Sequence, residues 1–343
     1  MRLHNSLYAM LQDAKVSNDC KDSLICPVER AQGPIKLPSG ASRETQLNSN
    51  NTTGLLLAVA GFATLSVGDA VIKSMAGAWP VVAVAALRFT IGASVLGAFL
   101  FWSEGKAGFK PTKPWLQVAR GACLAISSLA FFSAIYVMPL AETMAITFLS
   151  PVLTALLSGP LLGERVRPPV WIASAVAMAG VVIILRPNLA ELGWVALLPL
   201  LAAVFFSLMI IANRASAGQG SPLAMQAYMA IIAAPVLVLA ALGADSFGIG
   251  GIVIAWPTWD VIARCALVAF TASSAHWLIY LGTTKAGAAQ VAPASYVQML
   301  VAIALGWMWF GDVPDWLTLL GGAIIIGAGL YLWRDGNKEP ATS

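Results

Sequence analysis

The 343-residue chain has little charge, histidine or cysteine. Charged residues make up 10% of it, against about a quarter in soluble domains, and apolar residues make up 59%. One of its two histidines, His4, lies close to the N-terminus, and no cluster of histidines and acids is present. The chain therefore lacks the acid–base pairs and ligand sets that most enzymes and metal sites need. We expect no catalytic residue, no cofactor and no metal site.

Cysteine spacing and phosphate-loop motifs are equally sparse. Cys20 and Cys26 lie in a polar N-terminal segment, whereas Cys123 and Cys265 lie in apolar runs, so neither a disulfide framework nor a zinc pattern emerges. A Gly-Lys-Ser/Thr phosphate loop is also missing. Coupling of any activity to ATP hydrolysis is therefore improbable.

Long apolar runs are what the chain has instead. A helix needs about 20 residues to cross the hydrocarbon core, and ten runs approach or exceed this length. They do not alternate between apolar and polar residues as membrane β-strands do. We predict an all-α polytopic membrane protein with ten transmembrane helices. The runs are 54–75, 79–102, 115–137, 140–162, 168–186, 193–213, 222–243, 259–283, 287–310 and 315–333.

Basic residues gather in alternate connecting segments. With the N-terminus in the cytoplasm, the segments on the inner side carry almost all of them, and those on the outer side carry only Arg186. This is the positive-inside pattern, and it explains the net charge of +4 without a nucleic-acid partner. We expect both termini to be cytoplasmic.

The apolar runs fall into two related halves. Gly163 and Gly311 each lie in a short Gly-acid turn between two runs, and they align at the same offset as Arg186 and Arg334 (311 − 163 = 148). Because five runs form the first half, the second half must insert upside down, as in many secondary transporters. The expected divisions are a polar cytoplasmic tail, disordered or an over-long start, two five-helix repeats and a C-terminal tail, at 1–53, 54–186, 193–334 and 335–343.

Three charged residues lie inside the first two runs. Asp69 and Lys73 are four residues apart, so they share one helix face, and Arg88 lies at a similar depth in the next run. Charges at this depth cost about 2.5–3.5 kcal/mol each unless they are paired or face water. They form a self-neutralising cluster, the polar end of a substrate cavity, or both. Proton-coupled antiport through Asp69 is a secondary hypothesis, because two nearby cations favour the ionised carboxylate.

We expect residues of the second half to form the opposite wall of the cavity. Polar and aromatic side chains there complement the charges of the first half. His276 is either a hydrogen-bonded structural residue or a proton relay or ligand contact. The candidates are His276, Trp277, Tyr280, Tyr296 and Gln298.

The fourth run contains a predicted break. Pro151 removes one backbone hydrogen bond at mid-membrane, and such breaks are tolerated where protein or a water-filled cavity covers them. Ser150, which aligns with Gln298, is therefore a further cavity candidate. Glu142 lies in the first turn of the run, where a carboxylate stabilises the helix N-terminus, and Glu164 belongs to the structural turn that follows.

Two arginines lie near helix ends in matching places. Arg120 and Arg264 are separated by 144 residues, the same offset as Tyr136 and Tyr280. Long basic side chains near helix ends commonly extend to the lipid headgroups. We expect both arginines to do so.

Together these features resemble the EamA family of the drug/metabolite transporter superfamily, over about residues 54–334. The resemblance implies a ten-helix permease of the bacterial inner membrane with a central cavity. The family's substrates include amino acids, riboflavin-like vitamins, nucleoside-derived metabolites, polyamine-like cations and drugs. In the second copy Met299 stands in place of Pro151, and Asp312 in place of Glu164. The motifs are Leu87-Arg88-Phe89, Pro139-Leu-Ala-Glu142, Ser150-Pro151 and Gly163-Glu164.

We therefore predict a secondary transporter that moves a small metabolite or drug-like compound by alternating access at a midplane cavity. Its expected partners are the lipid bilayer and the transported molecule, and a homodimer is left open. Two alternatives come from other classes. An integral-membrane enzyme would need a nucleophile or a metal cluster at one interface, and a receptor or scaffold would need a folded soluble domain.

Overall fold

A computed structural model describes residues 40–162, 168–216, 219–248, 253–286 and 291–336. The chain divides into two units, 1–46 and 47–343, and every contact named below lies within the second. The described residues form helices and no strand. In chain order the elements are α2 Gly40–Lys73, α3 Val81–Glu104, η2 Gly105–Phe109, α4 Pro114–Val137, α5 Leu140–Thr147, α6 Ser150–Leu162, α7 Pro168–Leu192, η3 Gly193–Leu197, α8 Leu198–Ala215, α9 Pro222–Ser246, α10 Trp259–Ala286, η5 Ala292–Ser295, α12 Tyr296–Phe310 and α13 Trp316–Gly336.

Ten helical stretches among the described residues are long and apolar enough to cross a membrane. This confirms the predicted fold class of an all-α polytopic membrane protein. The stretches are Thr52–Lys73, Val81–Phe109, Pro114–Val137, Leu140–Leu161, Pro168–Leu185, Ala190–Ala215, Pro222–Ser246, Trp259–Thr283, Pro293–Phe310 and Trp316–Asp335.

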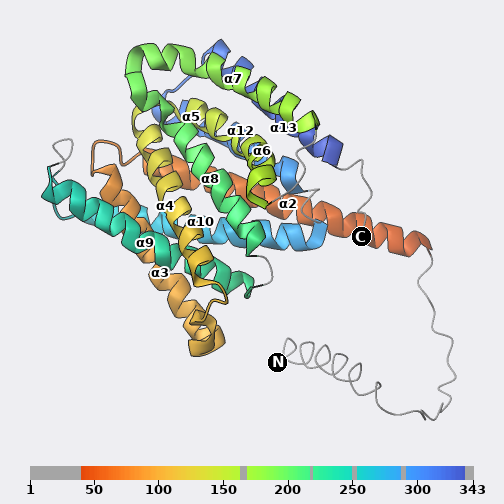
Figure 1. The fold of residues 1–343 in the computed structure, drawn as a ribbon, viewed down its shortest axis with the longest axis horizontal. Coiled ribbons are helices and arrows are strands. Elements are labelled where there is room, and N and C mark those ends of the chain that lie inside the picture. The colour runs from red at the N-terminus through yellow and green to blue at the C-terminus, as the bar shows by residue number, and fades with distance from the viewer. Residues whose placement is uncertain (1–39, 163–167, 217–218, 249–252, 287–290, 337–343) are drawn as a thin grey trace, which may run out of the picture. The chain divides into compact units, whose positions relative to one another are not determined.

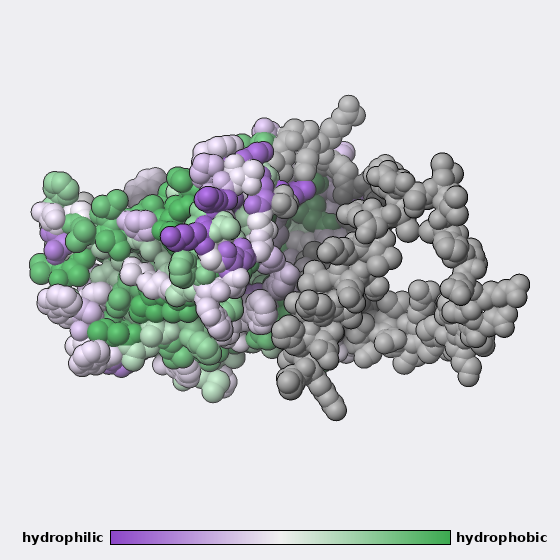
Figure 2. Space-filling view, turned by 90° about the horizontal axis from the view of Figure 1, so that it is seen from below, coloured by the Kyte–Doolittle hydropathy of each residue, from purple (hydrophilic) through white to green (hydrophobic). Residues whose placement is uncertain are grey.

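The surface of the helices is rich in large apolar side chains. Trp102, Trp194 and Phe270 are 83%, 82% and 70% exposed, each on or beside a membrane-crossing stretch. Figure 2 shows wide apolar areas on one face. Soluble monomers rarely expose contiguous apolar patches of such extent, and lipid chains are the partner that this surface fits.

Helix packing follows an approximate two-fold pattern. Figure 1 shows α7 running along α13 and α3 along α9, and the contacts agree. In each of these two pairs, the second helix is the membrane span that comes five spans after the first: span 10 after span 5, and span 7 after span 2. A third contact, of α4 (span 3) with α9 (span 7), has its equivalent five spans on in the contact of α10 (span 8) with α3 (span 2). These contacts therefore occur in matching positions in the two halves.

The fourth span is interrupted at the predicted place. Helix α5 ends at Thr147 and α6 begins at Ser150, so Pro151 lies in the first turn of α6, where its missing N–H would have had no helical partner. The Ser150 carbonyl, in the first turn of α6, accepts from the Ser207 hydroxyl of α8 at 2.9 Å and from the Thr154 hydroxyl at 2.8 Å. The break is therefore supported by hydrogen bonds from both halves of the chain.

The contact between α7 and α13 offers a test of the packing. Gly321 of α13 lies against Gly180 of α7, and a Cβ at Gly321 would lie 2.6 Å from the Ile184 side chain and 2.7 Å from the Gly180 carbonyl oxygen. We expect Gly321→Ala to lower the free energy of unfolding by about 1–3 kcal/mol through overpacking, measured as a fall in the thermal midpoint of the purified protein in detergent.

Gly327 on the same helix is the matched control. A Cβ there meets nothing within 4 Å, so Gly327→Ala should leave the midpoint unchanged or raise it, because alanine favours a helix over glycine by about 1 kcal/mol. Equal effects of the two substitutions would show that α7 and α13 do not pack closely.

Candidate functional site

Asp69 lies near the end of the first span, four residues before Lys73, and is held by the start of α12. The Gln298 side-chain amide donates to Asp69 Oδ2 at 3.2 Å. Ser66, one turn earlier on α2, donates from its hydroxyl to the Gln298 backbone carbonyl at 2.6 Å. The structure thus brings together one predicted residue from each half of the chain, and fixes α12 against α2 at this depth.

Arg88 enters the same region from α3 and is held by aromatic rings. Its guanidinium carbon lies 4.4 Å from the ring centroid of Phe89 and 5.2 Å from that of Phe132. A cation over an aromatic face within about 6 Å is stabilised by the ring quadrupole, by up to about 2 kcal/mol when desolvated. Within the described residues, no hydrogen bond or ion pair reaches the guanidinium. The hydrogen-bond donors of the guanidinium therefore have no partner among the described residues.

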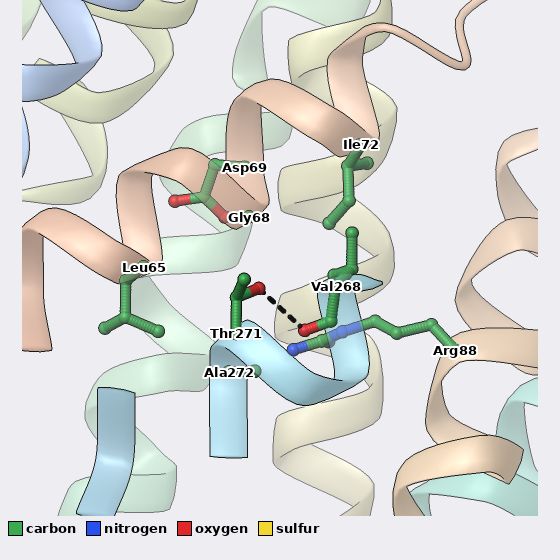
Figure 3. A pocket seen from close by; sticks show the side chains of 8 residues that line it. All are labelled: Leu65, Gly68, Asp69, Ile72, Arg88, Val268, Thr271 and Ala272. Carbon is green, nitrogen blue, oxygen red and sulfur yellow. Dashed lines mark hydrogen bonds between the residues drawn. The ribbon is translucent and has the colours of Figure 1, made fainter. Parts of the chain in front are cut away.

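A small cavity lies between α2, α3 and α10, and both charges line it. Its volume is about 20 Å³, room for about one water molecule. Figure 3 shows Asp69 on α2 and Arg88 extending from α3 toward α10, where the Thr271 hydroxyl donates to the Val268 carbonyl at 3.1 Å. No arginine or lysine nitrogen lies within 4.0 Å of the Asp69 carboxylate in the described part of the chain. The lining residues are Leu65, Gly68, Asp69, Ile72, Arg88, Val268, Thr271 and Ala272.

Lys73 pairs with an acid of the second half rather than with Asp69. Its Nζ lies 2.6 Å from Asp312 Oδ2 and donates to the Met138 carbonyl at the end of α4, at 2.8 Å. The Phe310 ring lies below the ammonium, 5.2 Å away. The Lys73 side chain is 12% exposed and that of Asp312 is 22% exposed, so water screens the ion pair little. Together with the Met138 contact, the pair joins the ends of α2, α4 and α12.

The turn that carries Asp312 explains its position. Gly311 ends α12 in the left-handed conformation, with φ 70°, which glycine adopts without steric cost. The Gly311 amide donates to the Trp307 carbonyl at 3.1 Å, the bonding of the αL motif, and the Asp312 amide donates to the Gly306 carbonyl at 3.0 Å. This turn places the carboxylate beside the end of α2.

Arg120 is buried, so the expectation that it extends to the headgroups is wrong. It is 2% exposed, and its Nε donates to the Asn213 side chain of α8 at 2.5 Å. It also donates to Gln117, one turn earlier on α4, and to the Met225 carbonyl of α9 at 3.4 Å. A buried arginine is stable only where such partners take up its donors. We call Gln117, Arg120, Asn213 and Met225 the Arg120 cluster.

Arg264 makes a related set of contacts at the other end of the helices. Its Nη1 donates to the Ser74 carbonyl, just past the end of α2, at 3.0 Å. Its Nη2 lies 2.9 Å from Asp260, one turn earlier on α10. We call Ser74, Asp260 and Arg264 the Arg264 cluster. Each arginine is thus braced from its own helix and reaches the end of the first helix of the other half.

The two clusters lie far apart. Lys73 contacts Met138 at the end of α4, and Ser74 follows directly, so the Arg264 cluster lies near that end. Arg120 precedes Met138 by 18 residues (138 − 120) on the same helix. At 1.5 Å per residue this corresponds to about 27 Å, most of the hydrocarbon thickness.

The other predicted cavity residues do not line the cavity beside Asp69. Ser150 is buried against α8. Tyr296 packs on Phe148, with ring centroids 5.5 Å apart. Three residues of α10 are exposed and lie beyond Ala272, the last cavity residue of that helix, and their roles in transport stay predictions. These are His276, Trp277 and Tyr280, the last two with rings 5.9 Å apart.

Two of the three predicted structural residues lie at helix starts. Glu142 lies in the first turn of α5, where a carboxylate faces the positive end of the helix dipole. Pro151 lies in the first turn of α6. Glu164 lies outside the described residues. Their proposed structural roles remain predictions.

Sequence reasoning missed three partners that the structure supplies. Asp312 was recognised only as part of a turn, and Asn213 and Thr271 were not considered as site residues. One signal could have found Asn213. It is the last residue of the sixth apolar run, as Ser74 lies at the end of the first run, and the arginines that contact them align at one offset.

The ten apolar spans make this chain a multi-pass membrane protein. Residues 52–186 and 193–333 each match the EamA-like transporter family, and the chain belongs to this family.

Curated relatives are named for several small molecules. A riboflavin transporter of Rhizobium johnstonii is 28% identical over 67% of this chain and 74% of its own length. An S-adenosylmethionine uptake transporter of Rickettsia prowazekii is 25% identical over 80% and 90%. A pseudopaline exporter of Pseudomonas aeruginosa is 28% identical over 82% and 96%. A crystal structure 22% identical, covering 86% of this chain and 99% of its own, superposes with a TM-score of 0.56 and supports the fold.

The Lys73–Asp312 pair can be tested by a double-mutant cycle. Asp312→Asn and Lys73→Met should each lower the free energy of unfolding by about 1–3 kcal/mol, because each leaves a partly buried charge without its partner. The double variant should lose less than the sum of the two, by about 0.5–3 kcal/mol. Thermal unfolding in detergent measures all three, with Lys110→Met at an exposed position as control. Strict additivity would rule out a direct interaction.

Proposed function

We propose that the protein is a secondary transporter that works by alternating access, with two inverted five-helix halves closing on each other at either end of a central site. The observation that carries this proposal is the pair of arginine clusters. Arg120 joins α4 of the first half to α8 and α9 of the second. Arg264 joins α10 of the second half to the end of α2 in the first. One closure therefore lies at each end of the helices.

The two-fold packing pattern and the two separate family matches support the inverted halves. The matches cover 52–186 and 193–333, and an odd number of spans in each half requires opposite insertion. With the basic residues on the cytoplasmic side, the Arg120 cluster faces the cytoplasm and the Arg264 cluster faces outward. The inner membrane of a bacterium is the location that we propose.

In this mechanism each half moves as a largely rigid body. Breaking the Arg264 cluster and the Lys73–Asp312 pair separates the ends of α2, α10 and α12, and opens the cavity beside Asp69 to the outside. Breaking the Arg120 cluster opens the inner side. Both closures are formed in the structure, with space for about one water molecule at the site, as expected of a closed intermediate without substrate. No catalytic step is part of the proposal.

The chemistry of the relatives bears on the substrate without fixing it. Their names include riboflavin, S-adenosylmethionine and pseudopaline. We propose that this chain moves a metabolite of similar size. Both an exporter and uptake transporters occur among the relatives, so either direction is compatible with the family.

Flux through reconstituted protein tests the function. Proteoliposomes would be challenged with a labelled pool of amino acids, vitamins and nucleoside metabolites, in uptake and in efflux. We expect wild-type flux of at least one compound and a loss of about tenfold or more in Arg88→Ala, because a hydrogen-bonded charge contributes about 1.5–3 kcal/mol. Arg214→Ala, at an exposed helix end, is the charge-matched control. Equal flux in Arg88→Ala and Arg214→Ala would remove Arg88 from the path.

A native cysteine reports on the closures. Cys265 follows Arg264 and is fully buried, with its Sγ 3.9 Å from Met75 Sδ near the end of α2. In a variant whose other three cysteines are serine, we expect Arg264→Ala to raise the rate at which an impermeant maleimide labels Cys265 from outside. Arg120→Ala should lower this rate, because it favours the state open to the inside. Each change should be about tenfold or more.

The opposite signs distinguish alternating access from simple loss of stability. A loosened but non-alternating bundle would label Cys265 faster in both arginine variants, and that result would contradict the mechanism. Lys110→Ala, at an exposed position, serves as control and should leave the labelling rate unchanged.

A further inference from the structure

Two buried serines tie the first helix of each half to an interrupted span of the other half. Ser66 of α2 donates to the Gln298 carbonyl of α12 at 2.6 Å, and the Ser207 hydroxyl of α8 lies 2.9 Å from the Ser150 carbonyl of α6. Both serines are 0% exposed. In the hydrocarbon core no water replaces such a bond, so each serine fixes one helix of its own half against the other half.

The two contacts occupy equivalent places in the halves. Gln298 and Ser150 align at the offset that relates the two Gly-acid turns (298 − 150 = 148), and each lies in the fourth span of its half. Ser66 and Ser207 are 141 residues apart (207 − 66), as are the basic residues in the last turns of α2 and α8 (214 − 73). The fold therefore makes the same contact between a serine hydroxyl and a backbone carbonyl twice.

An acid accompanies this contact in one half and not in the other. Asp69 follows Ser66 by three residues and accepts from the Gln298 side-chain amide at 3.2 Å. Its equivalent in the second half is Ile210 (210 − 69 = 141). An apolar residue is thus sufficient at this place for helix packing. Packing alone does not account for a carboxylate there, because a charge in an apolar span is costly.

Gln298 carries both contacts of the first half. It lies in the first turn of α12, where its backbone carbonyl accepts from Ser66 and its side-chain amide donates to Asp69. The amide bond, at 3.2 Å, is at the long end of the usual range of about 2.7–3.2 Å. A small movement of the first turn of α12 away from α2 would therefore break it, and the Ser66 hydroxyl opposes that movement.

We propose that Ser66 is a positioning residue of the transport path, because its hydroxyl fixes the first turn of α12 so that the Gln298 amide stays on the Asp69 carboxylate. Its counterpart Ser207 has a structural role alone. No acid lies one turn further along α8, and the Ser207 hydroxyl also lies 2.7 Å from the Ala203 carbonyl of its own helix. This inference rests on the proposed transport function and deepens it, because the position of Asp69 affects transport only if Asp69 lies on the path.

An apolar carbodiimide reports on Asp69 without a substrate. A protonated carboxyl group adds to dicyclohexylcarbodiimide and rearranges to a stable N-acylurea, whereas an ionised carboxylate does not react. The label would be quantified by mass spectrometry on the peptide that contains Asp69, in full-length protein in nanodiscs at one pH, with Asp69→Asn as the background. A hydrogen bond from the Gln298 amide stabilises the ionised form, so its loss should speed the labelling.

Variants of three residues separate positioning from stability. We expect Gln298→Leu to raise the labelling rate by about tenfold and Ser66→Ala by at least about threefold. Ser207→Ala removes the same group at the equivalent place. It should lower the thermal midpoint, as Ser66→Ala does, and leave the labelling rate at the wild-type value. The double variant Ser66→Ala/Gln298→Leu should label no faster than Gln298→Leu alone, because Ser66 acts through Gln298.

Two controls keep the result decisive. Maleimide labelling of Cys265 from outside, with the other three cysteines replaced by serine, should be unchanged in Ser66→Ala, because the serine positions α12 without closing the outer end. If Ser66→Ala does not fold, Ser66→Thr and Ser66→Val give the comparison at equal size, and the valine variant should label Asp69 faster.

Three results would overturn the positioning role. They are equal carbodiimide rates in Ser66→Ala and Ser207→Ala, a further increase in the double variant, and a rise in Cys265 labelling as large as that of Asp69. The last would show that Ser66 holds the helices together and that its loss merely admits the reagent.

Flux distinguishes this proposal from the transport function on which it rests. For a compound that the reconstituted protein moves, Ser66→Ala should raise KM by at least about threefold, and Ser207→Ala should leave KM unchanged. The expected carbodiimide rates without flux of any compound, in either direction, would contradict transport and keep the positioning of Asp69. Flux with an unchanged KM in Ser66→Ala would keep transport and remove Ser66 from the path.

Discussion

Charge that is buried among apolar helices has to find a partner, and this requirement organises the structure. With no water in the hydrocarbon core to solvate them, Lys73 and Arg120 are stable only through their contacts with Asp312 and Asn213. Each of these contacts crosses between the halves of the chain. Arg88 departs from the rule, since among the described residues it contacts aromatic rings and no hydrogen-bond or ion-pair partner. The departure lies beside the cavity, and for this reason we regard Arg88 as reserved for a ligand.

Two of the basic side chains bind the ends of other helices. A helix C-terminus presents carbonyl groups without partners and the negative end of the dipole. Lys73 donates to the end of α4, and Arg264 donates to the end of α2. Contacts of this kind satisfy the backbone while they form, and lipid headgroups or water can replace them at the membrane surface. They are therefore suited to breaking and re-forming, whereas the close glycine packing of α7 on α13 is suited to staying fixed.

The fold was largely predictable from the sequence, and the site only in part. Long apolar runs were enough to predict the ten spans, because a membrane constrains span length directly. Depth along a helix also follows from residue number, which identified Asp69 and Arg88. The rotation of each helix about its axis cannot be read from the sequence, because the sides of a helix that face lipid and protein are both apolar. Arg120 was therefore assigned to the headgroups, and Lys73 was grouped with Asp69 instead of Asp312.

The two arginine clusters differ in how deeply they are buried. Arg120 is 2% exposed, whereas Arg264 is 36% exposed at its side chain and pairs with an Asp260 that is 62% exposed. Contacts screened by water are weaker than buried ones. A carrier whose two closures differ in strength does not divide its resting time equally between its two sides. Such a bias makes the apparent affinity for substrate unequal on the two faces of the membrane, so that one protein can serve as a high-affinity collector in one direction and a low-affinity outlet in the other.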